Sequence, residues 1–157
     1  MRTSVLGHDA VNCGVEVLGG NGAIETFSIL PRLLRDNVVY ENWEGAHNVL
    51  RAQVLRDCMK LGAHHGFFAV LKERLGDRFS AELDDDLAQL EVTLNESHEG
   101  IRDLRFRRLA DRMATWLMLG GMEPLPELKP ALELSRRHLQ ELPVDRDYLG
   151  WVEALKR

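Results

Sequence analysis

Cysteine, aromatic residues and long apolar runs are all scarce in this sequence of 157 residues. Its two cysteines, Cys13 and Cys58, are too few for a disulfide framework, so we expect free thiols in a reducing cytoplasm. No apolar stretch approaches the roughly 20 residues that a membrane-spanning helix needs. These absences exclude a disulfide-rich secreted scaffold and predict a cytoplasmic protein with no membrane span.

Positively charged residues are also outnumbered: the chain has 20 Lys and Arg residues and 25 Asp and Glu residues, which gives a net charge of −5. General binding to nucleic acid needs a basic surface, so a nucleic-acid partner is not expected. The strongest basic stretch contains Arg102, Arg105, Arg107, Arg108 and Arg112, with Asp103 and Asp111 between them. We expect intrachain ion pairs or a subunit contact there.

Helical periodicity is what the sequence does contain. Apolar residues recur at three- and four-residue steps along most of the chain, and the only strand-like run is Val38–Tyr40. With aromatic residues at 6%, the core must come mainly from aliphatic side chains and methionine. The sequence predicts an all-α fold, an up-down helical bundle with an additional C-terminal helical extension.

Glycine and proline set the expected helix boundaries. We predict helices over 4–18, from Pro31 to Asp36, from Glu44 to Leu61, over 64–75, from Ser80 with a kink near Gly100 to Gly120–Gly121, over 130–142, and a last one capped by Asp145 or Asp147. The first is closed by a glycine turn, Gly19-Gly20-Asn21-Gly22.

Three groups of residues could in principle bind a metal ion or act in catalysis, but a structural role is the simpler interpretation of each. His64 and His65 are adjacent and have no acidic or histidine partner three or four residues away, so no metal site is expected. The acidic run Asp84–Asp86 lacks the glycine and terminal glutamate of a calcium loop and reads as a solvated helix N-terminus. For Arg35-Asp36, a structural ion pair is favoured over a catalytic role.

The stretch from Val15 to Arg56 carries the most specific pattern in the chain. Its glycine turn is followed by Arg35-Asp36 and then by Trp43-Glu44-Gly45. The three elements, in this order and spacing, resemble the C-terminal helical domain of the flavin-dependent acyl-CoA dehydrogenases. The glycine turn alone would mean little, since it lacks the strand context of a dinucleotide-binding fingerprint.

This resemblance implies FAD-dependent α,β-dehydrogenation of an acyl-CoA thioester, an oxidoreductase step of fatty acid metabolism. Glu44 would be the catalytic base, and its main-chain N–H would help to hold the thioester carbonyl. Trp43, Glu44 and Gly45 would contact the substrate, and a homo-oligomer is implied. The residues that match FAD-contacting positions are Glu16, Val17, Leu18, Gly19, Gly20, Ala46 and Asn48.

The sequence departs from the family's pattern at four positions. Glu16 replaces the usual glutamine, Ala23 an aromatic residue, Ala46 a threonine and Trp43 a tyrosine. Each lost hydroxyl or amide contact would weaken cofactor binding by about 1 kcal/mol. Trp43 together with a long helical tail resembles the family's alkylation-response branch and its relatives with extended C-terminal domains.

The resemblance covers roughly residues 3–60, so we expect a family-like segment over 1–58 and a helical extension over 59–157. The segment matches only a C-terminal domain, so we expect the chain to be the C-terminal portion of a longer dehydrogenase-like protein and to be inactive alone. The alternative is a non-catalytic helical interaction or DNA-damage-response module derived from the same family.

Overall fold

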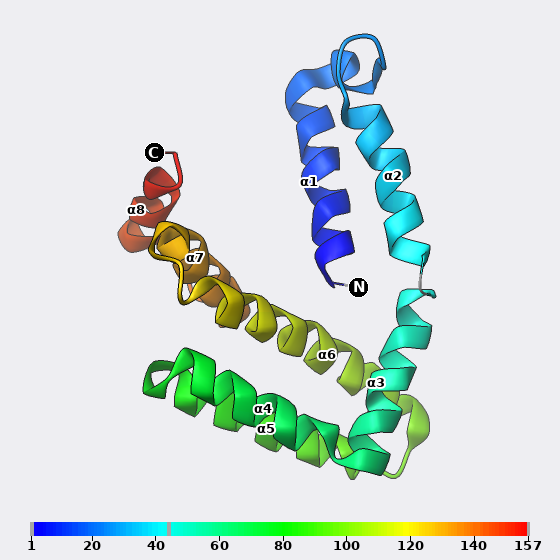
Figure 1. Cartoon of the computed structure of the whole chain (residues 1–157), viewed down its shortest axis with the longest axis vertical. Coiled ribbons are helices and arrows are strands. Elements are labelled where there is room, and N and C mark those ends of the chain that lie inside the picture. Colours follow the sequence, from blue (N-terminus) through cyan, green and yellow to red (C-terminus); the bar gives the residue numbers. More distant parts are fainter. Residues whose placement is uncertain (1, 44, 157) are drawn as a thin grey trace. The chain divides into compact units, whose positions relative to one another are not determined.

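The computed structural model describes residues 2–43 and 45–156, and these residues confirm the all-α prediction. They form eight α-helices and three short 3-10 helices, with no strand among them. In chain order these are α1 (Arg2–Leu18), η1 (Gly19–Ala23), α2 (Leu30–Asn42), α3 (His47–Leu61), α4 (Ala63–Leu75), η2 (Asp77–Phe79), α5 (Ser80–Leu94), α6 (Glu99–Met122), η3 (Pro126–Leu128), α7 (Lys129–Leu139) and α8 (Arg146–Ala154) (Figure 1). None of the described helices is both long and apolar enough to cross a membrane.

The contacts between residues divide the chain into two compact units, residues 1–53 (unit 1) and 54–157 (unit 2). The predicted boundary between residues 58 and 59 stays a prediction.

Unit 1 is built around a hairpin of α1 and α2. A side chain added at Gly14 would stand 3.2 Å from both methyl groups of Leu30, so a glycine there lets the two helices approach closely. A hydrogen bond of 3.0 Å from the Asn37 amide to the Ser4 carbonyl also joins them. Neither helix has a buried side chain, so the hairpin is held together without a core of its own.

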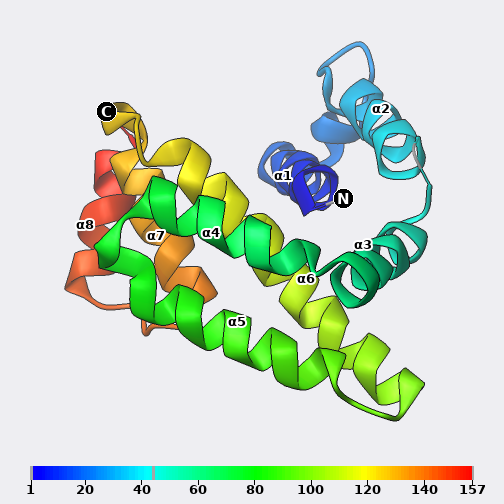
Figure 2. The same cartoon turned by 60° about the horizontal axis from the view of Figure 1, so that its bottom comes forward.

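Unit 2 contains an up-down arrangement of α4, α5 and α6, which pack against one another, while α7 packs on α6 and α8 on α7 (Figure 2). Its buried apolar residues form one cluster: Leu55, Cys58, Phe68, Leu71, Leu75, Phe79, Leu83, Leu90, Phe106, Leu109, Ala110, Met113, Trp116, Leu119, Leu132 and Leu139. Trp116 is fully buried, with its ring edge-on to Phe79. Leu83 and Leu90 of α5 therefore both face this core.

A buried carboxylate, Asp86, joins three helices of unit 2. It accepts hydrogen bonds from Arg112 Nε at 2.8 Å and from Trp116 Nε1 at 2.6 Å. Arg112 in turn donates to the Leu139 carbonyl at 2.7 Å. The prediction that this acidic run is solvated is thus wrong for Asp86, which is 2% exposed. The residue lies three positions after Leu83 and four before Leu90, so helical spacing places it on the core face.

Several predicted boundaries are corrected by the structure. The segment expected as one long kinked helix is two helices, because His98 begins a new one by accepting a hydrogen bond from the Ile101 N–H through its ring nitrogen. Helix α6 continues past Gly120, which is buried against Leu71, so this glycine serves close packing rather than termination. The strand-like run Val38–Tyr40 is part of α2.

Candidate functional site

The tip of the unit 1 hairpin, between α1 and α2, is shaped by the glycine turn. A side chain at Gly22 would come within 2.8 Å of the Val15 Cα atom, so only glycine fits this close approach. The Ser28 hydroxyl donates to the Gly22 carbonyl at 3.0 Å and accepts from the Leu30 N–H at 3.3 Å. These bonds fix the loop on the turn and satisfy an N–H at the start of α2, where Pro31 suits the first helical turn.

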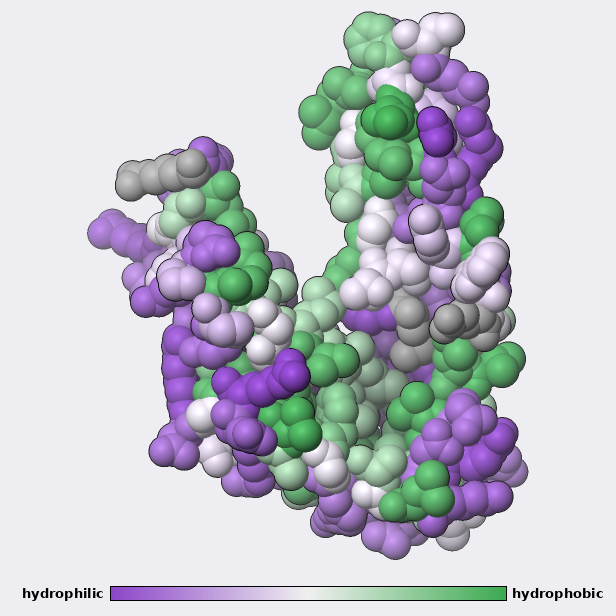
Figure 3. Space-filling model, in the orientation of Figure 1, coloured by the Kyte–Doolittle hydropathy of each residue, from purple (hydrophilic) through white to green (hydrophobic). Residues whose placement is uncertain are grey.

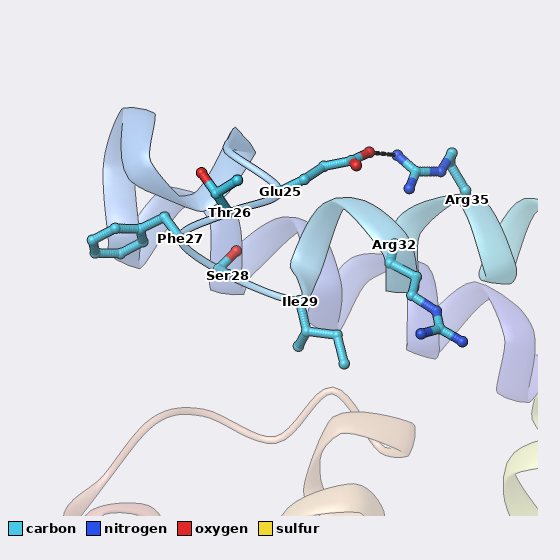
Figure 4. A pocket seen from close by; sticks show the side chains of 7 residues that line it. All are labelled: Glu25, Thr26, Phe27, Ser28, Ile29, Arg32 and Arg35. Carbon is cyan, nitrogen blue, oxygen red and sulfur yellow. Dashed lines mark hydrogen bonds and ion pairs between the residues drawn. The ribbon is translucent and has the colours of Figure 1, made fainter.

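The loop and the first turns of α2 surround an open pocket of about 400 Å³ (Figure 4). Its lining residues are Glu25, Thr26, Phe27, Ser28, Ile29, Arg32 and Arg35. The Arg35 guanidinium forms an ion pair with Glu25, and Arg32 Nε lies 3.7 Å from the Asp36 carboxylate. Arg35 and Asp36 are therefore both in ion pairs, although with different partners.

Charge and polarity make this pocket capable of receiving an anionic group beside an apolar one. The side chains of Arg32 and Arg35 are 74% and 60% exposed, so their remaining donors face solvent. Phe27 and Ile29 are 59% and 61% exposed. Green hydrophobic surface gathers around the hairpin tip in Figure 3. Guanidinium groups are good partners for phosphate and carboxylate.

The residues predicted to contact FAD fall into two groups. Glu16, Val17 and Leu18 form the last turn of α1, and Gly19 and Gly20 begin η1; all five are exposed.

The second group, Ala46 and Asn48, is also exposed and lies where α3 begins. The Ala46 carbonyl accepts from the Val49 N–H at 2.8 Å, and the Asn48 side chain accepts from Arg51 at 3.4 Å. Helix α2 separates the two groups by about 20 Å. The structure therefore does not gather them into one pocket.

Glu44, the predicted base, lies outside the described residues. Its neighbours are described: Trp43 is 77% exposed, and Gly45 has φ of +118°, a conformation that favours glycine. The Gly45 N–H donates to the Asn42 carbonyl at 3.2 Å, and α3 begins at His47 rather than at Glu44. Trp43 and Gly45 therefore both lie between α2 and α3.

The predicted sites omitted most of the pocket lining. Arg32 and Arg35 are three residues apart, which places them on one side of α2. The rest of the lining comes from the loop before α2, residues Glu25 to Ile29, which the sequence analysis did not identify as part of a site.

The basic stretch of α6 makes the expected intrachain ion pairs. Arg105 Nη1 lies 2.9 Å from the Glu96 carboxylate, and Arg112 binds Asp86. Arg102 donates to the Glu96 carbonyl at 3.2 Å. These arginines therefore stabilise unit 2.

Both cysteines are free thiols, as expected. Cys13 is exposed on α1, and Cys58 is buried in the core of unit 2. Burial raises the pKa of the Cys58 thiol, a hydrogen bond from the His64 main chain opposes this effect, and the nearby Asp57 adds to it. A buried thiol with a raised pKa is a poor nucleophile.

The family model described as "Acyl-CoA dehydrogenase, C-terminal domain" matches residues 1–59. Comparison with curated proteins and with solved structures found no match. The matched segment contains the glycine turn, the pocket and the Trp-Glu-Gly element. Residues 1–59 are thus related to the C-terminal domain of the acyl-CoA dehydrogenases, as their motifs predicted.

Proposed function

We propose that this chain is the C-terminal portion of an FAD-dependent acyl-CoA dehydrogenase-like protein. The reaction is α,β-dehydrogenation of an acyl-CoA thioester. The observation that carries the proposal is the family match over residues 1–59, which contains the glycine turn and the Trp-Glu-Gly element together. The fold class and the open pocket at the hairpin tip are compatible with it.

In this reaction the Glu44 carboxylate takes the proton from the α-carbon of the acyl chain. When bound, FAD supplies the acceptor for the hydride that leaves the β-carbon, so the substrate loses one proton and one hydride. The Glu44 N–H donates to the thioester carbonyl and stabilises the negative charge that develops on its oxygen. Apolar surroundings raise the pKa of a carboxylic acid and make its anion a stronger base.

The residues of unit 1 fit part of an FAD molecule. The exposed guanidiniums of Arg32 and Arg35 suit a pyrophosphate, and the exposed backbone of Gly19 and Gly20 allows close approach of a ligand. The Glu16 carboxylate opposes an anionic group and would weaken the interaction. Glu16 to Gly20 would hold the adenine and pyrophosphate side, and Ala46 and Asn48 would contact FAD from the start of α3.

The described residues of unit 1 do not enclose a flavin ring. Its pocket is open, and large apolar side chains such as Val17 and Trp43 are 85% and 77% exposed. A flavin and an acyl chain need an apolar enclosure. The proposed activity therefore requires further protein surface, from other domains or from a second copy of the chain, and the isolated chain is inactive.

The test is to isolate the protein from its host together with whatever subunits accompany it. We expect flavin absorbance in the purified material and acyl-CoA-dependent reduction of an artificial electron acceptor. Glu44→Gln keeps the size of the side chain and removes the base, so the rate should fall by at least about 100-fold. Flavin content should stay unchanged in this variant.

The matched control is Glu127→Gln, at an exposed glutamate of η3 in unit 2, which should keep full activity. Wild-type activity in Glu44→Gln would show that Glu44 is not the base, although the match to the family model would still stand. Protein that is colourless and binds DNA in a salt-dependent way would instead favour the non-catalytic module.

A further inference from the structure

Two histidines and a glutamate from neighbouring helices of unit 2 converge on one point. His64 and His65 lie in the first turn of α4, and Glu91 lies on α5. One ligand atom from each residue lies within 4.8 Å of the other two. His65 Nδ1 is 3.9 Å from the Glu91 carboxylate, and the two imidazole centroids are 4.0 Å apart. Sequence spacing missed this group because the acidic partner comes from a different helix.

His64 carries an unused donor or acceptor inside the protein. Its side chain is only 5% exposed, and its Nδ1 atom is buried with no hydrogen-bond partner. Buried polar atoms are almost always partnered, so an orphaned imidazole nitrogen indicates a missing ligand. The Cys58 main-chain carbonyl interacts with the same ring as an acceptor.

The surroundings of His64 act on its pKa in both directions. Burial lowers its pKa, the neighbouring His65 lowers it further, and Glu91 and the Cys58 carbonyl act in the opposite direction. The net effect is a pKa below the ordinary value.

We infer that His64, His65 and Glu91 form a binding site for a divalent transition-metal ion of the zinc class, joining α4 to α5. Two imidazoles and one carboxylate are the protein ligands of open zinc sites, where water takes the fourth position. Imidazole favours zinc, cobalt, nickel and copper ions over magnesium and calcium.

The geometry needs only a small adjustment to hold the ion. Ligand atoms about 2.0–2.2 Å from a tetrahedral zinc ion lie about 3.3 Å apart. Because the present atoms lie within 4.8 Å of one another, they must close by up to about 1.5 Å. The side chains of His65 and Glu91 are 63% and 49% exposed and can rotate toward the buried His64. Their exposure also gives the ion a route of entry and leaves room for water.

The experiment is calorimetric titration of the full chain with Zn²⁺, repeated with Co²⁺ while visible ligand-field absorption is recorded. A Cys13→Ser background removes the exposed thiol, which would otherwise bind zinc itself. We expect one ion per chain. His65→Gln and Glu91→Gln should each weaken binding by at least about 10- to 100-fold, the loss that even an outer-shell partner causes. Both sites are exposed, so neither change should prevent folding.

His64→Gln is the third ligand variant, with circular dichroism to confirm that it folds. Glu73→Gln, at an exposed position of α4, and His138→Gln, on α7, are matched controls that should bind like the parent. Absence of Zn²⁺ binding by the parent chain overturns the inference. So does binding that is equally tight in His65→Gln and Glu91→Gln.

Discussion

The two units of this protein contrast in how they use their apolar residues. Unit 2 buries them: Trp116 is fully inaccessible and lies within a continuous core. Unit 1 exposes them, with Trp43 at 77% and Ile29 at 61%, and its two helices bury no side chain. The family relationship, however, lies in residues 1–59. Most of the buried core therefore lies outside the matched segment, and many large apolar side chains of unit 1 are exposed.

The sharpest test of this contrast uses the two tryptophans. Trp116→Ala should lower the free energy of unfolding by about 3–5 kcal/mol, because it leaves a large cavity and removes the indole donor to Asp86. Urea denaturation followed by circular dichroism measures the change. Trp43→Ala, at an exposed tryptophan, should change stability by less than about 0.5 kcal/mol. Equal losses in both variants would end the distinction between a unit with a core and one without.

The second test addresses the buried carboxylate of unit 2. Asp86→Asn keeps the shape of the side chain but removes the charge that faces Arg112, so unfolding should become easier by about 2–3 kcal/mol. The control is Asp85→Asn on the same helix, where the side chain is exposed and the change should stay below about 0.5 kcal/mol. A similar effect at both positions would mean that the network around Asp86 does not stabilise the core.

Asp86 also shows how far sequence reasoning reached. Composition and apolar spacing predicted the all-α class and most helices. On α5, Leu83 and Leu90 form one stripe of buried leucines. The same spacing places Asp86 on that stripe. The run Asp84–Asp86 was nevertheless expected to be exposed to solvent, because the partners of Asp86 could not be known from the sequence. Those partners, Arg112 and Trp116, lie on another helix 26 and 30 residues away in sequence. Contacts between distant segments are what local pattern cannot supply.

The candidate sites divide in the same way. The Trp-Glu-Gly element and the glycine turn were recognisable because each is a local pattern within a few residues. The metal-ligand group was not, since His64 and Glu91 meet only when α4 packs on α5. Helix ends were least predictable: Gly120 was taken as a stop, although its contact with Leu71 makes it a packing residue inside α6. A glycine has several structural uses, and only tertiary contacts distinguish them.

The third test asks whether the hairpin tip of unit 1 is packed tightly enough for an added methyl group to destabilise it. Gly22→Ala would place a methyl group 2.8 Å from the Val15 Cα atom and 2.9 Å from its carbonyl oxygen. Because these are backbone atoms, the turn must distort, and we expect a loss of about 1–3 kcal/mol in local stability. Hydrogen exchange of the amides in α1 and α2 measures it. Gly20→Ala meets nothing within 4 Å and is the control. Unchanged exchange in Gly22→Ala would show that the hairpin tip is not tightly packed.

The smallest expected effect is a pH dependence in unit 2. The Glu82 carboxylate accepts from Gln140 at 2.6 Å and from Arg136 at 3.3 Å. Partial burial raises the pKa of Glu82, but its hydrogen bonds with its own main chain, Gln140 and Arg136 outweigh this, so the net pKa is lowered. A lowered pKa in the folded state stabilises the protein above the unfolded pKa of about 4.3, and this contribution is lost as pH falls through the folded value.

Glu82→Gln should therefore unfold more easily than the parent by up to about 1 kcal/mol at neutral pH, and the gap should close in acid. Chemical denaturation at about pH 7 and about pH 3 measures both differences. The same change at Glu25, whose side chain is 64% exposed in its pair with Arg35, should have a smaller effect. If the Glu82 gap persists in acid, its cause is packing between α5 and α7 rather than charge. If Glu25→Gln costs more than Glu82→Gln, the ion pair at the hairpin tip supports unit 1 more strongly than its exposure implies.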